Sequence, residues 1–271
     1  ASERAFCIGR WLILNQKYLS TEQRTNILTI LAADIDFISD NLEWHLDGNH
    51  LLKNLSALWW GTKVLTSDLH AKWERILKKH LYKTIEEQIL HDGLHYEKSP
   101  IYHQIALIDF MDILTVIDKN DQEHEYLRNL TKKMASALSM LTHPDGNTCL
   151  FNDAPSNLTS STNEVLRYCE KCLGSLSSVN CLDHAGYYQF KNDDLYVVAD
   201  FGDLGPDEQM GHAHSDMFHF ELSYKNTRVL VEGGTSSYYS PVRRKYERST
   251  LAHNTVTVNN CSQSTNWHNF R

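Results

Sequence analysis

The sequence lacks any segment that is long and apolar enough for a membrane helix. Crossing a bilayer takes roughly 18 consecutive apolar residues, and no run in these 271 residues reaches that length. The opening stretch, ASERAFCIGRWLILN, is also a poor signal peptide, because its apolar part is short and Arg10 interrupts it. The sequence therefore predicts a protein that does not span a membrane.

Clustered positive charge is scarce as well. The net charge is −8, and the one concentrated basic stretch is RRKYER at residues 243–248. Nucleic-acid binding relies on clustered lysine and arginine to neutralise phosphates, so we expect no nucleic-acid partner. An anionic substrate needs only a few local positive or hydrogen-bonding groups and is not excluded. The composition, 41% hydrophobic and 22% charged residues, is typical of a globular protein.

Cysteines are too few for a disulfide scaffold in a chain of this length. Six are present, and Cys169 and Cys172 form a CxxC motif that no second CxxC accompanies. The motif lies in EVLRYCEKCLG, which has the pattern of the end of an amphipathic helix. This context favours a structural or incidental role over a redox or zinc-binding one.

The two halves of the chain differ in their hydrophobic period. Up to about residue 175, apolar residues recur at helical spacing, and short polar breaks predict antiparallel helical hairpins. From about residue 184, short β-branched and aromatic segments with turn signals predict an antiparallel sheet. The predicted helices cover residues 21–44, 49–65, 71–90, 101–117 and 124–141, and the predicted strands cover residues 186–191, 194–201, 217–224, 227–234 and 254–260.

This change of period places a domain boundary between residues 178 and 179, giving domains 1–178 and 179–271. No low-complexity linker separates the halves, so we expect a packed interface between them. Five short strands alone would leave a sheet with unprotected edges. We therefore expect the natural polypeptide to continue past Arg271.

Two helix starts carry candidate chemical groups. In EWHLDGNHLLKN, Asn49 and His50 begin a helix, where Asn49 either caps the helix or, with His50 and the backbone amides, neutralises a carboxylate. In EKSPIYHQ, Pro100 places Tyr102 and His103 in the first turn of another helix. A tyrosine can exchange a proton with a substrate if its surroundings favour the phenolate. Packing is the competing interpretation for Tyr102.

The stretch GHAHSD contains His212 and His214 at a spacing that places both side chains on one side of an extended segment. The pair is compatible with metal ligation, with a catalytic base beside a ligand, or with a polar loop that has no chemistry. A metal site needs a third ligand, for which Glu232 and His253 are candidates, each beside a predicted strand end. Such a set of nitrogen and oxygen donors suits Zn²⁺.

Five stretches, in this order, resemble the heparinase II/III-like polysaccharide lyases, a group that includes heparan-sulfate lyases and alginate and oligo-alginate lyases. They are GNHLLKN, DGLHYEKSPIYH, GHAHSDMFHFEL, RVLVEGGTSSY and RSTLAHNTVTVNNCSQS, and the resemblance runs from about residue 8 to the end. It implies an incomplete α/α toroid followed by an antiparallel β-sandwich, with the active site in the cleft between them. By that standard the chain starts late and stops early, as a fragment or a shortened relative would. Most relatives act in the bacterial periplasm or outside the cell, so the resemblance also implies a periplasmic or secreted location.

The resemblance implies β-elimination on a polysaccharide that contains uronic acid. In such enzymes a proton leaves C5 of the uronate, the 4-O-glycosidic bond breaks, and an unsaturated sugar remains. Asn49, with His50, matches the position that neutralises the uronate carboxylate. Tyr102 matches the tyrosine that protonates the leaving oxygen and, for some substrates, also removes the C5 proton. His212 matches the histidine that acts as the base when that proton lies on the other face.

The resemblance also implies a structural zinc ion and a set of substrate contacts. His214, Glu232 and His253 match the zinc positions, although the middle ligand in relatives is typically aspartate. If His214 binds the metal and His212 faces the substrate, a local bend after Gly211 must direct them apart. The predicted substrate-binding residues are His103, Arg243, Tyr246 and Arg248, and Arg244 could also meet carboxylates or sulfates.

Two other functions compete with the lyase interpretation. A non-catalytic glycan-binding or scaffold protein could keep the same fold, but the joint presence of the matched polar residues argues against the loss of activity. A toroid hydrolase would need a pair of carboxylic acids that act together. The sequence shows acidic residues scattered in loops and no convincing pair, so this reading ranks last.

Overall fold

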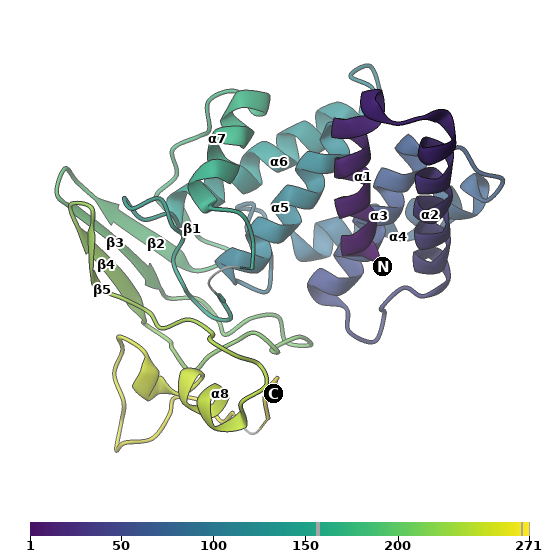
Figure 1. The fold of residues 1–271 in the computed structure, drawn as a ribbon. Coiled ribbons are helices and arrows are strands. Elements are labelled where there is room, and N and C mark those ends of the chain that lie inside the picture. The colour runs from purple at the N-terminus through teal and green to yellow at the C-terminus, as the bar shows by residue number, and fades with distance from the viewer. Residues whose placement is uncertain (156–157, 267, 271) are drawn as a thin grey trace. The chain divides into compact units, whose positions relative to one another are not determined.

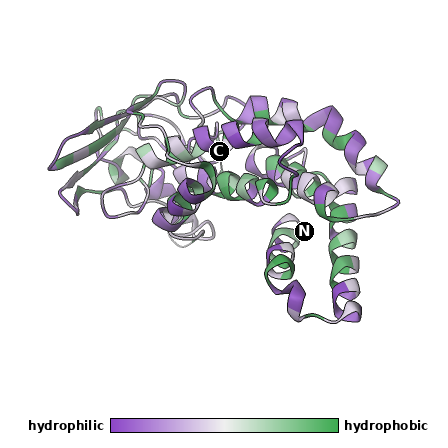
Figure 2. Ribbon diagram, turned by 90° about the horizontal axis from the view of Figure 1, so that it is seen from above, coloured by the Kyte–Doolittle hydropathy of each residue, from purple (hydrophilic) through white to green (hydrophobic). Residues whose placement is uncertain are grey.

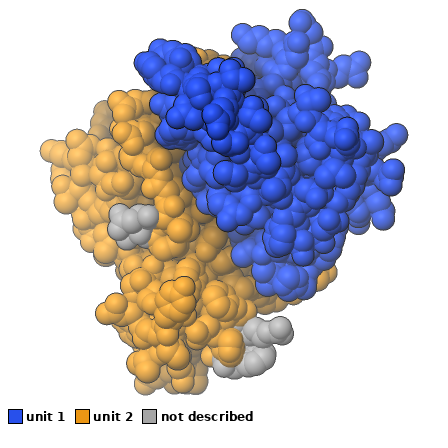
Figure 3. Space-filling view, turned by 45° about the vertical axis from the view of Figure 1, so that its right-hand side comes forward, with its two compact units in different colours: residues 1–88, 108–129 blue, residues 89–107, 130–271 orange. Residues whose placement is uncertain are grey.

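The computed structural model describes residues 1–155, 158–266 and 268–270. The chain forms two compact units (Figure 3). Unit 1 comprises residues 1–88 and 108–129, and unit 2 comprises residues 89–107 and 130–271. Two long helices therefore contribute residues to both units. No helix among the described residues has the length and apolar character needed to cross a membrane.

Unit 1 is helical. Apolar and polar stretches alternate along the helices, as expected for amphipathic elements (Figure 2). Fully buried tryptophans, Trp59, Trp60 and Trp73, form the bulk of its interior together with Leu31 and Ile35. Its helices are α1 (Ser2–Asn15), α2 (Thr21–Asp40), α3 (Gly48–Val64), α4 (His70–Gln88), the second part of α5 (Pro100–Leu114) and the first part of α6 (Gln122–Met140).

The start of α2 at Thr21 agrees with the predicted helix range, and its cap is Ser20, which forms a capping box with Gln23. Asn49 does not cap α3, because the helix already begins at Gly48 and the residue before it, Asp47, has a left-handed φ of 53°. Asn49 therefore lies inside the first turn, and the capping interpretation of this residue is wrong.

Unit 2 contains one five-stranded sheet among its described residues, with neighbouring strands antiparallel in the order β1-β2-β3-β4-β5 (Figure 1). The strands are β1 (Cys181–Leu182), β2 (Tyr187–Lys191), β3 (Leu195–Asp200), β4 (Phe220–Tyr224) and β5 (Thr227–Leu230). The unit also holds α7 (Thr162–Leu173), the short α8 (Pro241–Glu247), and the remaining parts of α5 and α6. The predicted fold class, helical hairpins followed by an antiparallel sheet, is confirmed.

The prediction of a strand at residues 254–260 is wrong. Its alternation of valine and threonine suits a strand, but only the single bridge between Val258 and Cys261 forms there. Val256 and Val258 are 72% and 69% exposed. Asn254 instead donates from its side-chain amide to the carbonyls of Phe220 and Val231, at 3.1 and 3.0 Å. The backbone here is held by a side chain and not by a neighbouring strand.

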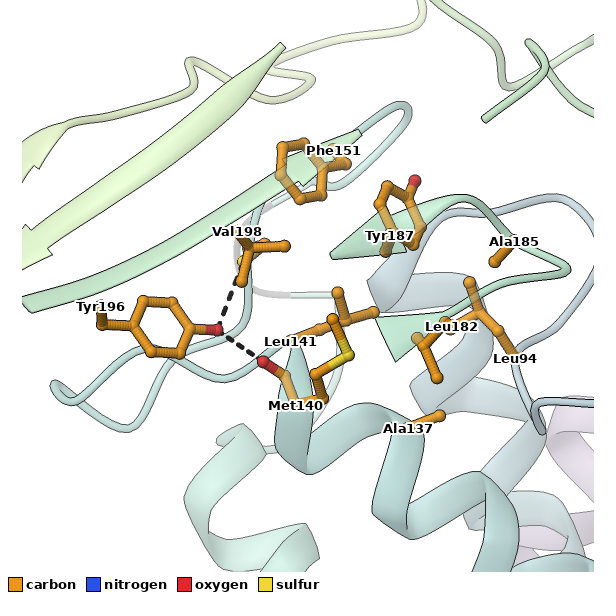
Figure 4. Close-up of a cluster of buried hydrophobic side chains, with 11 residues drawn as sticks. Leu94, Ala137, Met140, Leu141, Phe151, Leu182, Ala185, Tyr187, Tyr196 and Val198 are labelled. Atoms are coloured by element: carbon orange, nitrogen blue, oxygen red, sulfur yellow. Dashed lines mark hydrogen bonds between the residues drawn. The ribbon is translucent and has the colours of Figure 1, made fainter. Parts of the chain in front are cut away.

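The core of unit 2 joins the inner face of the sheet to the end of α6 and to the segment before α5 (Figure 4). Phe151 stacks on Tyr187 with ring centroids 5.1 Å apart. The buried tyrosine hydroxyls also find partners, since Tyr196 donates to the Met140 carbonyl and Tyr187 to the Lys98 carbonyl, each at 2.6 Å. These bonds fix the loops that lead into the candidate site.

Candidate active site

The segment that carries His212 and His214 is a turn, because the Ala213 amide donates to the Met210 carbonyl at 3.2 Å. The two imidazoles nevertheless meet at one group, the carboxylate of Asp153. His212 Nδ1 lies 2.8 Å from Oδ2, and His214 Nε2 lies 2.8 Å from Oδ1. The two histidines contact Asp153 through different ring nitrogens, so His212 Nε2 and His214 Nδ1 face different surroundings.

Asp153 is the hub of the site, and sequence reasoning missed it. Arg244 binds both carboxylate oxygens through its two terminal nitrogens, and Thr235 donates to Oδ1 at 2.9 Å. Burial alone raises the pKa of Asp153, but hydrogen bonds from His212 and His214, together with Arg244, hold it far below its usual range. The hub is therefore a permanent anion that orients two histidines and one arginine.

His212 presents Nε2 as its working nitrogen. Because Nδ1 donates to Asp153, the lone pair of the neutral ring is on Nε2, which lies 3.6 Å from a Glu97 carboxylate oxygen. Burial lowers the pKa of His212, but the bond to Asp153 and the charges of Glu97 and Asp153 raise it above its ordinary value overall. The arrangement is that of a base whose orientation and charged form are both supported by a carboxylate.

Tyr102 lies in the first turn of α5, which begins at Pro100 as predicted. Its ring lies against that of His212, with centroids 4.2 Å apart. Its hydroxyl is 3.0 Å from the hydroxyl of Tyr238. Burial is the main cause that raises the pKa of Tyr102 to about 12. At neutral pH the hydroxyl therefore keeps its proton and is suited to donate it.

His103 was predicted to bind substrate, and its surroundings do not support that role. The side chain is fully buried, with Nε2 2.9 Å from the Met134 carbonyl and Nδ1 accepting from the His95 amide at 3.2 Å. Burial lowers the pKa of His103 to about 4. Both nitrogens are occupied inside unit 2, so His103 anchors the start of α5 to α6.

The basic stretch separates into exposed and buried residues. Arg243 and Tyr246 are exposed on α8, where a substrate could reach them. Arg248, also a predicted substrate contact, is 2% exposed and donates to the carbonyls of Ala213 and His268 at 2.9 and 2.8 Å. It therefore holds the backbone beside the histidine turn, and the predicted contact is corrected.

The predicted zinc ligands come together in unit 2. One donor atom from each of His214, Glu232 and His253 lies within 4.8 Å of the other two. His214 uses Nε2 toward Asp153, and His253 uses Nδ1 toward Glu232 at 2.8 Å. The remaining nitrogens, His214 Nδ1 and His253 Nε2, are buried and have no hydrogen-bond partner among the described residues.

A fourth residue, His219, supports this group. Its Nδ1 accepts a hydrogen bond from the backbone amide of Asn254 at 2.9 Å, so the proton of the neutral ring is on Nε2. That Nε2 atom lies 3.1 Å from a Glu232 oxygen. His214 has a buried lone-pair nitrogen, and its far ring nitrogen donates to the Asp153 carboxylate, which is the usual preparation of a metal-ligating histidine. The residues present therefore fit a zinc ion.

Asn49 and His50 lie in unit 1, in the first turn of α3. They line a hollow of about 450 Å³, together with Lys53. His50 Nδ1 is 3.5 Å from a Glu43 oxygen, and the His50 side chain is 50% exposed. Tyr102, His212 and the metal group belong to unit 2, so the predicted catalytic residues are divided between the two units.

The family model described as "Heparinase II/III N-terminus" matches residues 11–176, and "Heparinase II/III-like, C-terminal" matches residues 175–271. The chain belongs to the heparinase II/III-like family. The two family segments meet at residues 175–176.

Individual members of the heparinase II/III-like family are similar over most of the chain. "Heparin-sulfate lyase" from Pedobacter heparinus is 26% identical, covering 82% of this chain and 38% of that protein. The same-named protein of Bacteroides thetaiotaomicron is 22% identical, covering 90% and 41%. "Crystal Structure of Heparinase III" aligns with a TM-score of 0.73 at 20% identity, covering 94% of this chain and 46% of that one. The chain thus spans less than half the length of these relatives.

Proposed function

We propose that this chain forms the core of a polysaccharide lyase that cleaves a glycosaminoglycan or another glycan containing uronic acid by β-elimination. The observation that carries the proposal is the pair formed by Tyr102 and His212, in which a protonated phenol lies against an imidazole oriented by Asp153. Similarity to heparin-sulfate lyases supports the substrate class. A polymeric glycan is met outside the cytoplasm, so the proposal includes a periplasmic or secreted location.

The proposed reaction uses the two side chains in sequence. His212 Nε2 takes the proton from C5, the C4–O bond breaks as the C4–C5 double bond forms, and Tyr102 gives its proton to the leaving oxygen. The negative charge of Asp153 stabilises the imidazolium that results. With the opposite uronate epimer, Tyr102 would serve as both base and acid. Its pKa of about 12 requires a strong local electrostatic gain for that role.

The proposal assigns carboxylate neutralisation to Asn49 and His50. The carboxylate next to C5 already carries a negative charge, and proton removal adds more, so a hydrogen-bond donor at the carboxylate lowers the barrier. Lys53 lines the same hollow of unit 1, together with Glu3 and Glu43. Its charge is shared with Asp109 and Glu3, at 2.9 and 2.8 Å.

The test is the rise in ultraviolet absorbance from the unsaturated product. A folded, full-length protein should be assayed on heparan sulfate, hyaluronan, alginate and bacterial exopolysaccharides. We expect a rise with at least one of them. Binding to a glycan without any absorbance rise on the whole panel would reject the lyase and favour the non-catalytic glycan-binding protein.

We further propose that His214, Glu232 and His253 bind a structural Zn²⁺ ion. When bound, the ion would tie together three segments of unit 2, including the turn that carries His212, and take no part in the reaction. The support is the pair of buried lone-pair nitrogens described above.

His253→Ala should remove one equivalent of zinc per chain and lower the melting temperature. A bound metal stabilises only the folded state, so loss of the metal lowers the free energy of unfolding. Elemental analysis and thermal unfolding measure the two effects. The exposed His45 offers a matched control, since His45→Ala should change neither. Unchanged zinc content in His253→Ala would contradict this assignment.

A further inference from the structure

A second group of donor atoms lies in unit 2, apart from the residues discussed so far. His143 and Cys149 flank the turn that follows α6, closed by a bridge between Thr142 and Thr148, and Glu221 lies on β4. All three side chains are buried, and one donor atom from each lies within 4.8 Å of the other two. We propose that His143, Cys149 and Glu221 form a second, thiolate-containing Zn²⁺ site.

His143 is prepared as a ligand. Its Nδ1 is 2.7 Å from the Ser223 hydroxyl, which can accept the ring proton and leave the lone pair on Nε2. That Nε2 atom is buried and makes no hydrogen bond among the described residues, although a Glu221 oxygen lies only 3.2 Å away. A separation of 3.2 Å without a hydrogen bond is compatible with two atoms that ligate one metal ion in tetrahedral geometry. A simple His–Glu pair would align Nε2–H with the carboxylate.

Glu221 is held in place by groups on its other sides. The Leu150 amide donates to Oε1 at 2.6 Å, and Arg228 donates to Oε2 at 3.1 Å. Arg228 in turn binds the Asp145 carboxylate, at 2.8 Å from Nε. Such outer contacts orient a ligating carboxylate and tune its affinity.

The charges around the group favour a divalent ion. Without a metal, the buried Glu221 carboxylate and the 29% exposed Asp145 carboxylate share the single charge of Arg228, and the buried Nε2 of His143 makes no hydrogen bond among the described residues. A Zn²⁺ ion together with a Cys149 thiolate brings the local charge to balance. Buried charges are expensive unless they are paired or coordinate metals.

The donor set selects the metal. Thiolate, imidazole and carboxylate together suit Zn²⁺, and three protein ligands leave one tetrahedral position for water. The metal binds the thiolate form of Cys149, so binding releases the thiol proton to solvent. Binding therefore strengthens as pH rises. The bound ion would tie the turn after α6 to β4, beside the core that includes Cys149.

Co²⁺ is the probe that separates this site from the first. A thiolate bound to Co²⁺ gives a near-ultraviolet charge-transfer band, which the His214–Glu232–His253 group cannot give because it has no sulfur. We expect the full chain, stripped of metal and titrated with Co²⁺, to develop this band up to one equivalent. Cys149→Ser should lose the band. Cys172→Ser, at an exposed cysteine, and His253→Ala should keep it.

The outcome does not depend on whether Cys149→Ser folds. A variant with the exposed Cys7, Cys172 and Cys261 all replaced by serine keeps the group intact. X-ray absorption on its zinc form should show one sulfur per chain among the metal ligands. A zinc form without sulfur, or a Co²⁺ band unchanged in Cys149→Ser, would overturn the proposal. Neither measurement uses a glycan substrate, so failure of the lyase proposal would leave this result unaffected.

Discussion

Tyr102→Phe should eliminate product formation while leaving glycan binding largely intact. The substitution removes one oxygen and keeps the ring that lies against His212. Without the hydroxyl, the leaving oxygen loses its proposed proton donor, and positioned acid catalysis is worth roughly 10²–10⁴-fold in rate. The absorbance assay would measure kcat, and calorimetric titration with the same glycan would measure affinity.

The control for this variant is Tyr239→Phe, because Tyr239 is 95% exposed and directly follows Tyr238 in the sequence. It should behave as the unsubstituted chain. Tyr238→Phe provides an intermediate case, since it removes the hydroxyl 3.0 Å from that of Tyr102 and leaves the acid in place. Near-normal turnover in Tyr102→Phe would contradict the proposed acid.

Elements with strong periodicity were predictable from the sequence. α5 begins at Pro100 because proline is tolerated in a first helical turn, and β3 buries every second residue as its alternation predicts. The segment 254–260 has the same alternation and forms no strand. Strand formation depends on a neighbour that supplies hydrogen bonds, and local sequence does not contain that information.

The hub of the site could not be predicted in this way. Asp153 lies in the irregular stretch CLFNDAP, where no periodicity marks it, and Asn152 beside it has a left-handed φ of 57°. Its importance comes from partners about 60 to 90 positions away in sequence. The spacing of His212 and His214 places both imidazoles on one side of an extended segment, but it does not identify the carboxylate that they share.

Burial decided the two corrected substrate contacts. His103 and Arg248 belong to residue types that commonly bind anionic glycans, and each is adjacent to a site residue or lies in the basic stretch. The structure places both inside unit 2, where they bind backbone carbonyls. Arg244 lies four residues before Arg248 in the same basic stretch. It is equally buried, but it contacts the Asp153 carboxylate itself. Neighbouring arginines of similar sequence context therefore have different functions.

Asp153→Asn is expected to damage both activity and stability. An amide cannot accept from His212, His214 and Arg244 together, and its NH₂ group would face donors. The Arg244 charge would then be buried without an anion, a loss that costs about 3–5 kcal/mol. His212 would also lose the partner that fixes its tautomer, so kcat should fall by roughly 10²–10⁴-fold. Asp193→Asn, at an exposed turn residue, is the matched control.

The pH dependence distinguishes this role from a general loss of packing. The carboxylate raises the pKa of His212, so its removal should move the acidic limb of kcat/KM to lower pH. The folded-state pKa of Asp153 is depressed, so its contribution to stability is present above the unfolded value of about 3.9 and is lost as pH falls toward the folded value. The difference in unfolding free energy between the two proteins should therefore be full at pH 7 and shrink below about pH 4. A difference that stays constant across this range would show that Asp153 acts through packing and not through its charge.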